Sequence, residues 1–508
     1  MSLAATAAAQ NGFQFQDWKP LESEARLGPK AGCGDLRSFT GYEVSIVTAA
    51  HVPASAEAPK HCRISGQILP EIRFEVSLPA AWNRRFYMFG NGGYAGESLE
   101  APNRVATRNR ALQRGFAVAQ TNTGHDAATE PLAAFAVNRQ KLLDYSFRAV
   151  HVTAETGKKL AESHYGLAPA RSYFDGCSTG GRQGLILAQR FPADFDGIVV
   201  GAPVLNFSAT MVSYAWIARG LAAAPIAPAK LKILAERVYA TCDPQDGLKD
   251  GLITDPRQCR FQPGRDLPKC SGEAEDAGCF TTRQIEALER VYADVMSQGK
   301  RFFPGWPAGA EIAGPEGRSG WEPWIVNAAG RTIGVNFSET FFRYMGFPEQ
   351  DPRYDLSRFD FDRDPGRLGW IHEVLDATDP DLTRFQTRGG KIVMYYGWAD
   401  PALNPLMGVE YYQQVAERLG ARTSGFFRLF MVPGMFHCRG GVGTSEFDAL
   451  TPLAGWVERS TAPEKIVASR TLNGKVVRTR PLCPYPQVAT YQGAGSIDEA
   501  GSFTCQAP

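Results

Sequence analysis

The octapeptide at residues 176–183, GCSTGGRQ, contains a Gly-x-Ser-x-Gly motif centred on Ser178. Residues 171–175 before it predict the end of a short strand, and residues 184–191 after it predict a helix that Pro192 closes. Glycines around a serine on such a tight turn let the backbone take a strained shape and lift the hydroxyl out of the fold. The amides that begin the following helix can stabilise an oxyanion formed there. The motif therefore predicts a serine nucleophile.

An α/β-hydrolase carries its acid and its histidine after the serine in the chain. The sequence has seven histidines, and two of them, His372 and His437, lie far enough downstream. His437 follows the apolar run 426–432 and a Pro-Gly turn, which predicts a loop just past a strand. His372 lies in a helix-like segment, where a surface or packing role is expected. His437 is therefore the predicted general base.

The acid predicted to orient this histidine is Asp400. Residues 389–397 predict a buried parallel strand, and Asp400 follows that strand directly. Functional groups of open α/β sheets gather at the carboxyl ends of strands. The alternative is an ordinary turn residue before Pro401. In the predicted triad, His437 takes the proton of Ser178, and Asp400 fixes the histidine tautomer and stabilises the imidazolium.

The strand pattern predicts an α/β fold with one large insertion. Strand-like segments run through residues 63–68, 72–78, 85–89, 115–120 and 197–201, and residues 142–165 have helical spacing. From about residue 206 to about residue 379 this pattern gives way to Pro-, Gly- and aromatic-rich segments. We therefore predict an α/β-hydrolase catalytic domain formed by residues 1–205 and 380–508, with a lid domain at residues 206–379.

The glycine-rich loop 90–93 is the second element expected around the oxyanion. One donor in α/β-hydrolases is the amide after the nucleophile, here Thr179, and another comes from a loop after an earlier strand. Loop 90–93 follows such a strand, so Gly92 or Gly93 is the predicted second donor. An ordinary glycine turn remains the alternative.

Cysteines stand beside two of the predicted catalytic residues. Cys177 precedes Ser178 and Cys438 follows His437, so a Cys177–Cys438 disulfide would join the elbow to the histidine loop; two separate buried thiols are the alternative. The segments GCSTGGR (176–182), GWADP (397–401) and HC (437–438) resemble the signatures of the tannase and feruloyl esterase family. The resemblance runs from about Cys33 to Cys505. It implies an α/β-hydrolase core with a large lid, a triad of Ser178, Asp400 and His437, and aromatic-acid esters as substrates.

The resemblance also implies a disulfide pattern and a metal site. The ten cysteines form groups, and the family pattern implies Cys33–Cys62, Cys177–Cys438, Cys242–Cys259, Cys270–Cys279 and Cys483–Cys505. Such pairing is typical of a secreted or periplasmic protein. The residues of the lid loop 242–255 alone favour a solvated acidic turn. The resemblance implies instead a structural Ca²⁺ held by the side chains of Asp243, Asp246 and Asp250 and by the carbonyls of Leu248 and Leu252. No organic cofactor is expected.

Substrate-binding residues are harder to choose. Aromatic segments 321–324 and 341–347 of the lid are candidates to clamp an aromatic acyl group, and the selected side chains are Arg343, Phe347, Tyr396 and Trp398. Feruloyl or galloyl esters are the expected substrates. The family includes hydrolases of mono(2-hydroxyethyl) terephthalate, which makes terephthalate monoesters the alternative. Tyr396 stands where that resemblance predicts a histidine. A serine acyltransferase, a peptidase and a non-catalytic binding protein on the same fold also stay open.

Charge and hydropathy limit the partners. The formal net charge is +1 and no basic tract is present, which argues against a nucleic-acid partner. No apolar run approaches the roughly 20 residues that a membrane span needs. The first nine residues, MSLAATAAA, lack the basic start of a signal peptide, so we interpret them as a mature start. The expected partner is a small aromatic ester, and the oligomeric state is open.

Overall fold

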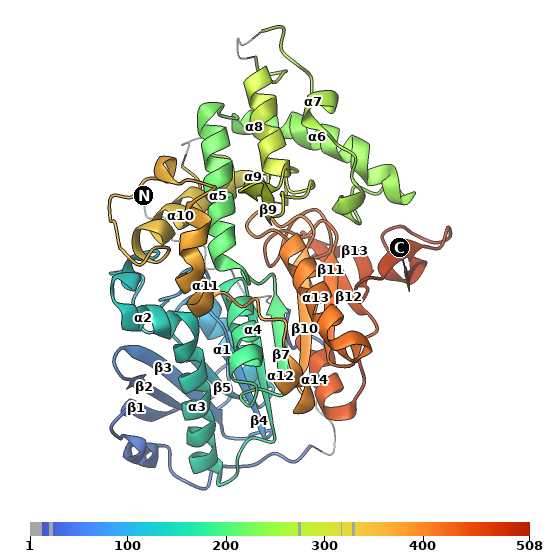
Figure 1. Ribbon diagram of the computed structural model, residues 1–508. Helices are drawn as coiled ribbons and strands as arrows, with labels where there is room; N and C mark the ends of the chain where they lie inside the picture. The colour runs from blue at the N-terminus through green and yellow to red at the C-terminus, as the bar shows by residue number, and fades with distance from the viewer. Residues whose placement is uncertain are drawn as a thin grey trace.

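The computed structural model describes residues 13–19, 24–272, 276–315, 317, 319–327 and 331–507 (Figure 1). The predicted mature start at residues 1–9 lies outside the described residues.

A nine-stranded mixed sheet forms the centre of the protein, with the strand order β1-β2-β3-β5-β4-β6-β7-β10-β11. The pairs from β1 to β5 are antiparallel, whereas β5-β4-β6-β7-β10-β11 are parallel. The parallel strands at the centre are buried almost throughout, as expected for a sheet covered on both faces. The strands are β1 Val44–Val52, β2 His61–Ile68, β3 Ile72–Pro79, β4 Arg85–Phe89, β5 Ala117–Thr121, β6 Arg171–Cys177, β7 Gly197–Gly201, β10 Lys391–Gly397 and β11 Phe427–Val432. The α/β-hydrolase prediction is confirmed.

Helices α1, α3, α4 and α14 pack against this sheet. The helix predicted over residues 142–165 is divided into α2, a π-helical turn at Asp144–Arg148, and α3. The helix after the elbow begins at Thr179, five residues earlier than the sequence predicted. The helices of the catalytic part are α1 Pro102–Gln113, α2 Arg139–Leu143, α3 Ala149–Tyr165, α4 Thr179–Arg190, α12 Thr383–Thr387, α13 Leu406–Leu419 and α14 Leu450–Arg459.

The long segment between β7 and β10 adds no described strand to the central sheet. It holds a short hairpin, β8 Val295–Ser297 with β9 Lys300–Phe303, and helices α5 Phe207–Ala223, α6 Leu231–Cys242, α7 Pro263–Asp266, α8 Thr282–Tyr292, α9 Trp321–Trp324, α10 Ile333–Tyr344 and α11 Gly369–Leu375. Helices α5, α6 and α8 lie together beyond one end of the sheet (Figure 1). The bounds of the lid at residues 206 and 379 stay a prediction.

Two further hairpins complete the carboxyl-terminal part, β12 Ile466–Leu472 with β13 Lys475–Leu482, and β14 Val488–Tyr491 with β15 Phe503–Gln506. Across the described ranges, no helix combines the length and the apolar character that a bilayer span requires.

The parallel strands carry the predicted triad. In the order β6-β7-β10-β11, Ser178 follows β6, Asp400 follows β10 and His437 follows β11. Because these strands run in the same direction, their carboxyl ends meet at one edge of the sheet. The fold therefore brings all three segments to the same side of the molecule.

Candidate active site

Ser178 stands on a strained turn between β6 and α4. Its backbone has φ 64° and ψ −123°, a conformation that few residues with a side chain adopt. The flanking glycines allow this turn to close. A Cβ on Gly176 would lie 2.5 Å from the carbonyl carbon of Gly180, so the motif leaves no space for a side chain there. The elbow predicted from the sequence is present.

Asp400 and His437 form the second part of the site. Nδ1 of His437 lies 2.8 Å from Oδ2 of Asp400. The other carboxylate oxygen of Asp400 accepts hydrogen bonds from the amides of Ala402 and Leu403, at 2.8 and 2.9 Å. The Asp400 side chain is fully buried and that of His437 is 8% exposed. The acid is thus fixed by three partners and in turn fixes the imidazole ring.

A disulfide connects the serine and histidine segments. Cys177 and Cys438 are bonded, with their Cα atoms 6.0 Å apart and a separation of 261 positions in sequence. Nε2 of His437 lies 3.8 Å from the Cys438 sulfur, and among the described contacts no hydrogen bond joins it to the Ser178 hydroxyl. Hydrogen bonds of this kind often tighten only when substrate is bound. The disulfide keeps the two segments adjacent in the absence of that bond.

The glycine loop lies against the first turn of α4. A Cβ on Gly90 would lie 2.6 Å from the Cα of Gly180, so the loop and the helix meet backbone to backbone. The amide of Gly92 donates to Oε1 of Glu97 at 2.7 Å. The amides of Gly93 and Thr179 have no acceptor among the described residues. Of the two predicted glycines, Gly93 is the one whose amide is available to an oxyanion.

Aromatic rings stand next to these groups. The ring of Trp324 lies 5.7 Å from that of His437 in an edge-on arrangement. Phe337 stacks on Tyr94 at 4.7 Å, and its ring would be 3.3 Å from a Cβ on Gly93. Trp324 and Phe337 are half-buried. Sequence reasoning pointed to the segment of Trp324 but missed Phe337, because nothing in the pattern of α10 shows which aromatic residue faces the site.

Trp324 also borders a cavity of about 530 Å³ that is lined by residues of the long segment between β7 and β10. Apolar side chains of α5, among them Tyr214 and Ile217, line part of it, and Arg331 and Glu339 add charge. The cavity therefore has the mixed lining that an aromatic ligand with polar substituents requires.

The four side chains predicted to bind substrate are engaged with the protein itself. Arg343 pairs with Glu339 at 3.3 Å and donates to the Tyr354 carbonyl at 3.0 Å. The other three are 4% exposed or less: Phe347 packs on Phe342, the Tyr396 hydroxyl donates to the Pro203 carbonyl, and Trp398 lies under Arg257. These contacts give the four residues packing roles, and their binding of substrate stays a prediction.

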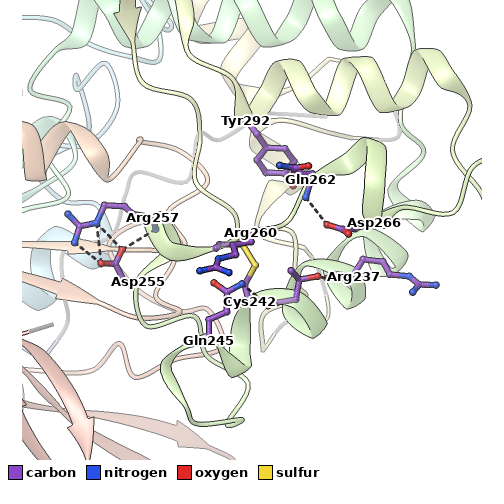
Figure 2. The surroundings of a disulfide bond; sticks show 12 residues. Arg237, Cys242, Gln245, Asp255, Arg257, Arg260, Gln262, Asp266 and Tyr292 are labelled. Carbon is purple, nitrogen blue, oxygen red and sulfur yellow. Dashed lines mark hydrogen bonds and ion pairs between the residues drawn. A yellow bond between two sulfur atoms is a disulfide. The ribbon is translucent and has the colours of Figure 1, made fainter.

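The acidic loop after α6 is held by its own carboxylates. Asp243 accepts from the amides of Asp250 and Gly251, both at 3.1 Å, and Asp246 accepts from the Leu248 amide at 2.9 Å. Asp250 accepts from the Leu252 amide at 3.2 Å and pairs with Arg480 of β13 at 2.6 Å. Figure 2 shows the Cys242 disulfide at the start of this loop, with Asp255 and Arg257 paired beside it.

Carboxylates and carbonyls are the ligands that Ca²⁺ prefers, so the donor types of the loop suit this ion. In the described part of the chain, however, no three acidic, histidine or cysteine side chains converge closely enough to hold a metal. Each aspartate instead bonds to amides, and Asp250 also bonds to a guanidinium. The calcium site stays a prediction.

The five disulfides form the pairs expected from the sequence: Cys33–Cys62, Cys177–Cys438, Cys242–Cys259, Cys270–Cys279 and Cys483–Cys505. None of the described cysteines is free.

Comparison with known proteins agrees with this geometry. The family model for tannase and feruloyl esterase matches residues 56–506. A mono(2-hydroxyethyl) terephthalate hydrolase of Piscinibacter sakaiensis is 36% identical, covering 96% of this chain and 93% of its own. Feruloyl esterase B of Aspergillus niger is 31% identical, with coverages of 92% and 90%. The crystal structure of feruloyl esterase B from Aspergillus oryzae superposes with a TM-score of 0.80 at 26% identity, covering 93% of this chain and 99% of that one.

Proposed function

The chain belongs to the tannase and feruloyl esterase family and is a carboxylic ester hydrolase, and on this premise we propose that it cleaves esters of aromatic acids, of the feruloyl and galloyl type, through an acyl-enzyme on Ser178. The observation that supports this substrate class is the pair of half-buried rings, Trp324 and Phe337, beside His437 and Gly93. Two aromatic rings beside His437 and Gly93 favour a flat aryl group over an aliphatic chain.

The mechanism assigns one role to each side chain. His437 takes the proton of the Ser178 hydroxyl as the oxygen attacks the ester carbonyl, and Asp400 holds the imidazole through Nδ1. The amides of Thr179 and Gly93 donate to the tetrahedral oxygen. Protonated His437 then gives its proton to the departing alcohol, which leaves the aromatic acyl group on Ser178. Water, activated by the same histidine, releases the acid.

A second candidate substrate is a terephthalate monoester. The relative from Piscinibacter sakaiensis supports it, and so does Arg331, which lines the same cavity as Trp324 and is 55% exposed. A guanidinium at that position could bind the free carboxylate of such a monoester. Arg331 also bonds to Glu339 and Asn336, which offsets part of its charge.

The experiment compares the hydrolysis of methyl ferulate, methyl gallate and mono(2-hydroxyethyl) terephthalate. The rate of each reaction is measured as the release of the free acid. We expect the highest kcat/KM for one of the first two. The second candidate would be selected by two results together. The wild-type enzyme would prefer the terephthalate ester, and Arg331→Met would lose that preference while its turnover of methyl ferulate stays unchanged. Inactivity on all three would contradict the aromatic-ester proposal.

We also propose that the protein acts outside the cytoplasm, in the periplasm or after secretion, and that the loop of Asp243, Asp246 and Asp250 binds a structural Ca²⁺. Five disulfides and no free cysteine among the described residues support the first proposal. Three carboxylates within eight residues support the second: amides and Arg480 already bond to them, and a divalent cation would offset the negative charge that remains.

A further inference from the structure

One carboxylate holds two consecutive residues of the glycine loop. Oε1 of Glu97 accepts from the Gly92 amide at 2.7 Å, and Oε2 accepts from Nδ2 of Asn91 at 2.8 Å. We infer that Glu97 is a positioning residue for the oxyanion hole, because it orients the loop so that the Gly93 amide faces the reacting centre. This inference rests on the proposed hydrolysis at Ser178.

The peptide unit between Gly92 and Gly93 is held by hydrogen bonds to its own carbonyl and to both neighbouring peptide units. Only its N–H, on Gly93, has no acceptor among the described residues. Its carbonyl, on Gly92, accepts from the Ala95 amide at 2.7 Å. The preceding peptide donates to Glu97, and the following carbonyl, on Gly93, accepts from the Tyr145 hydroxyl at 3.1 Å and from the Thr179 hydroxyl. Gly93 has φ +53°, where a residue without Cβ costs least. The free N–H therefore has one orientation, set in advance of the reaction.

Asn91 and Arg104 belong to a buried polar network that contacts the Glu97 carboxylate. The side chain of Asn91 donates through Nδ2 to the Thr121 carbonyl at 2.9 Å. The backbone amide of Asn91 donates to Oε1 of Gln183 in α4 at 3.0 Å. Arg104 is 4% exposed and donates to the Gly90 and Thr121 carbonyls at 3.2 and 3.3 Å. Its guanidinium lies 3.9 Å from the Glu97 carboxylate. This cation offsets a negative charge that would otherwise repel the developing oxyanion.

The consequence is specific to the transition state. Loss of one oxyanion donor lowers kcat about 10²- to 10³-fold in serine hydrolases, because the negative oxygen exists only after attack. A donor that is present but poorly oriented should cost less. Replacement of Glu97 is thus expected to lower kcat about 10- to 100-fold and to change KM by less than about threefold.

The test is Glu97→Gln, because glutamine replaces one of the two accepting carboxylate oxygens by an NH2 group, which donates and cannot accept, so either Gly92 or Asn91 loses its present acceptor. Glu100→Gln is the matched control: Glu100 is 52% exposed and pairs with Arg63 and Arg108. For each folded variant, kcat and KM are measured on the best ester of the panel. Affinity is measured for an arylboronic acid, which forms a tetrahedral adduct on serine, and for the product acid.

We expect Glu97→Gln to lower kcat and boronate affinity together by at least about tenfold, with product affinity unchanged and Glu100→Gln like wild type. Unchanged kcat in a folded Glu97→Gln enzyme would overturn the inference. If that variant does not fold, Glu97→Asp replaces it in the test. Aspartate keeps the negative charge but has a shorter side chain, so the same fall in kcat and boronate affinity is expected. An inactive wild-type enzyme would contradict the proposed function instead, so the two failures are distinguishable.

Discussion

Nδ1 of His437 is bonded to the buried carboxylate of Asp400 at 2.8 Å, although 37 residues separate the two along the chain. The same carboxylate accepts from two backbone amides, so it cannot rotate away from the ring. His437 is therefore held with Nε2 as the nitrogen that can accept a proton from Ser178. This relationship is the basis of the first prediction.

Ser178→Ala and His437→Ala should each lower kcat by several powers of ten while the protein stays folded, because each removes a member of the triad. Asp400→Asn should also be severely impaired, since an amide at this position favours the wrong histidine tautomer. The measurement is steady-state hydrolysis of methyl ferulate, with the thermal unfolding midpoint as the test of folding. Near-wild-type turnover in any of the three would contradict the assignment.

His372→Ala is the matched control. His372 also bonds to an aspartate, with Nδ1 2.9 Å from Oδ2 of Asp376, but it lies in α11 and its side chain is 44% exposed. A histidine–aspartate pair alone therefore does not make an active site. We expect this variant to keep wild-type kcat.

Replacement of the Cys177–Cys438 disulfide by two serines should reduce both activity and stability. Chain-entropy arguments give a cross-link over a loop of this length roughly 5 kcal/mol, and the loss of alignment between Ser178 and His437 should lower kcat by about tenfold or more. The control is the double serine variant of Cys483–Cys505, which joins residues 22 apart near the β14–β15 hairpin. If both double variants kept full kcat, the long-range disulfide would have no role in catalysis.

Calcium should stabilise the lid without changing the chemistry. A metal that binds only the folded loop adds stability by mass action, so a chelator should lower Tm by a few degrees and calcium should restore it. Asp246→Ala should abolish this response and keep kcat at low temperature. The control is Asp266→Ala, which removes an ion pair with Arg265 outside this loop. This variant should keep the response of Tm to chelator and calcium. No calcium in elemental analysis, together with a Tm that chelator does not change, would reject the site.

Asp175 should make a contribution to stability that falls with rising pH. Burial raises the pKa of this carboxyl to about 7; Tyr87 and Gln14 donate to it, Arg110 lowers the pKa, and the charge of Asp448 raises it further. The unfolded value is near 4. The folded protein therefore binds an extra proton at Asp175 between about pH 4 and 7, and the contribution of this group to stability decreases across that range, by up to about 4 kcal/mol.

Asp175→Asn should flatten the decline of Tm between pH 4 and 7, because the amide does not titrate. The control is Asp381→Asn: the ion pair with Arg418 lowers the pKa of Asp381, so that group titrates below this range. Thermal unfolding at half-unit pH steps measures both. Parallel pH profiles for wild type and Asp175→Asn would refute the prediction.

The sequence predicted the strands of the catalytic part, and the placement of Ser178, Asp400 and His437 after them, because these signals are local. Apolar runs followed by Ser178, Asp400 and the His437 loop predict strand ends, and parallel strands bring such ends together whatever the details of packing. The strand order, in which β5 lies outside β4 and joins the antiparallel strands, could not be predicted, since it depends on long-range pairing.

The choice between Gly92 and Gly93, and the identity of the aromatic ring beside the glycine loop, depend on tertiary contacts. Nothing in the loop sequence distinguishes Gly92 from Gly93; the choice depends on Glu97, which occupies one amide and leaves the other free. Phe347 and Phe337 are both aromatic residues of the segment between β7 and β10, yet Phe347 is buried and Phe337 lies beside the glycine loop. Composition and spacing do not encode which way each ring faces.

The most direct test of the account is to label the enzyme with diethyl p-nitrophenyl phosphate and to locate the adduct by peptide mass spectrometry. The account predicts one diethyl phosphoryl group, on Ser178, with hydrolysis of methyl ferulate lost in proportion to labelling and no adduct in Ser178→Ala. Hydrolysis that survives complete labelling of Ser178, or an adduct on another residue that accompanies the loss of activity, would contradict the assignment of Ser178 as the nucleophile.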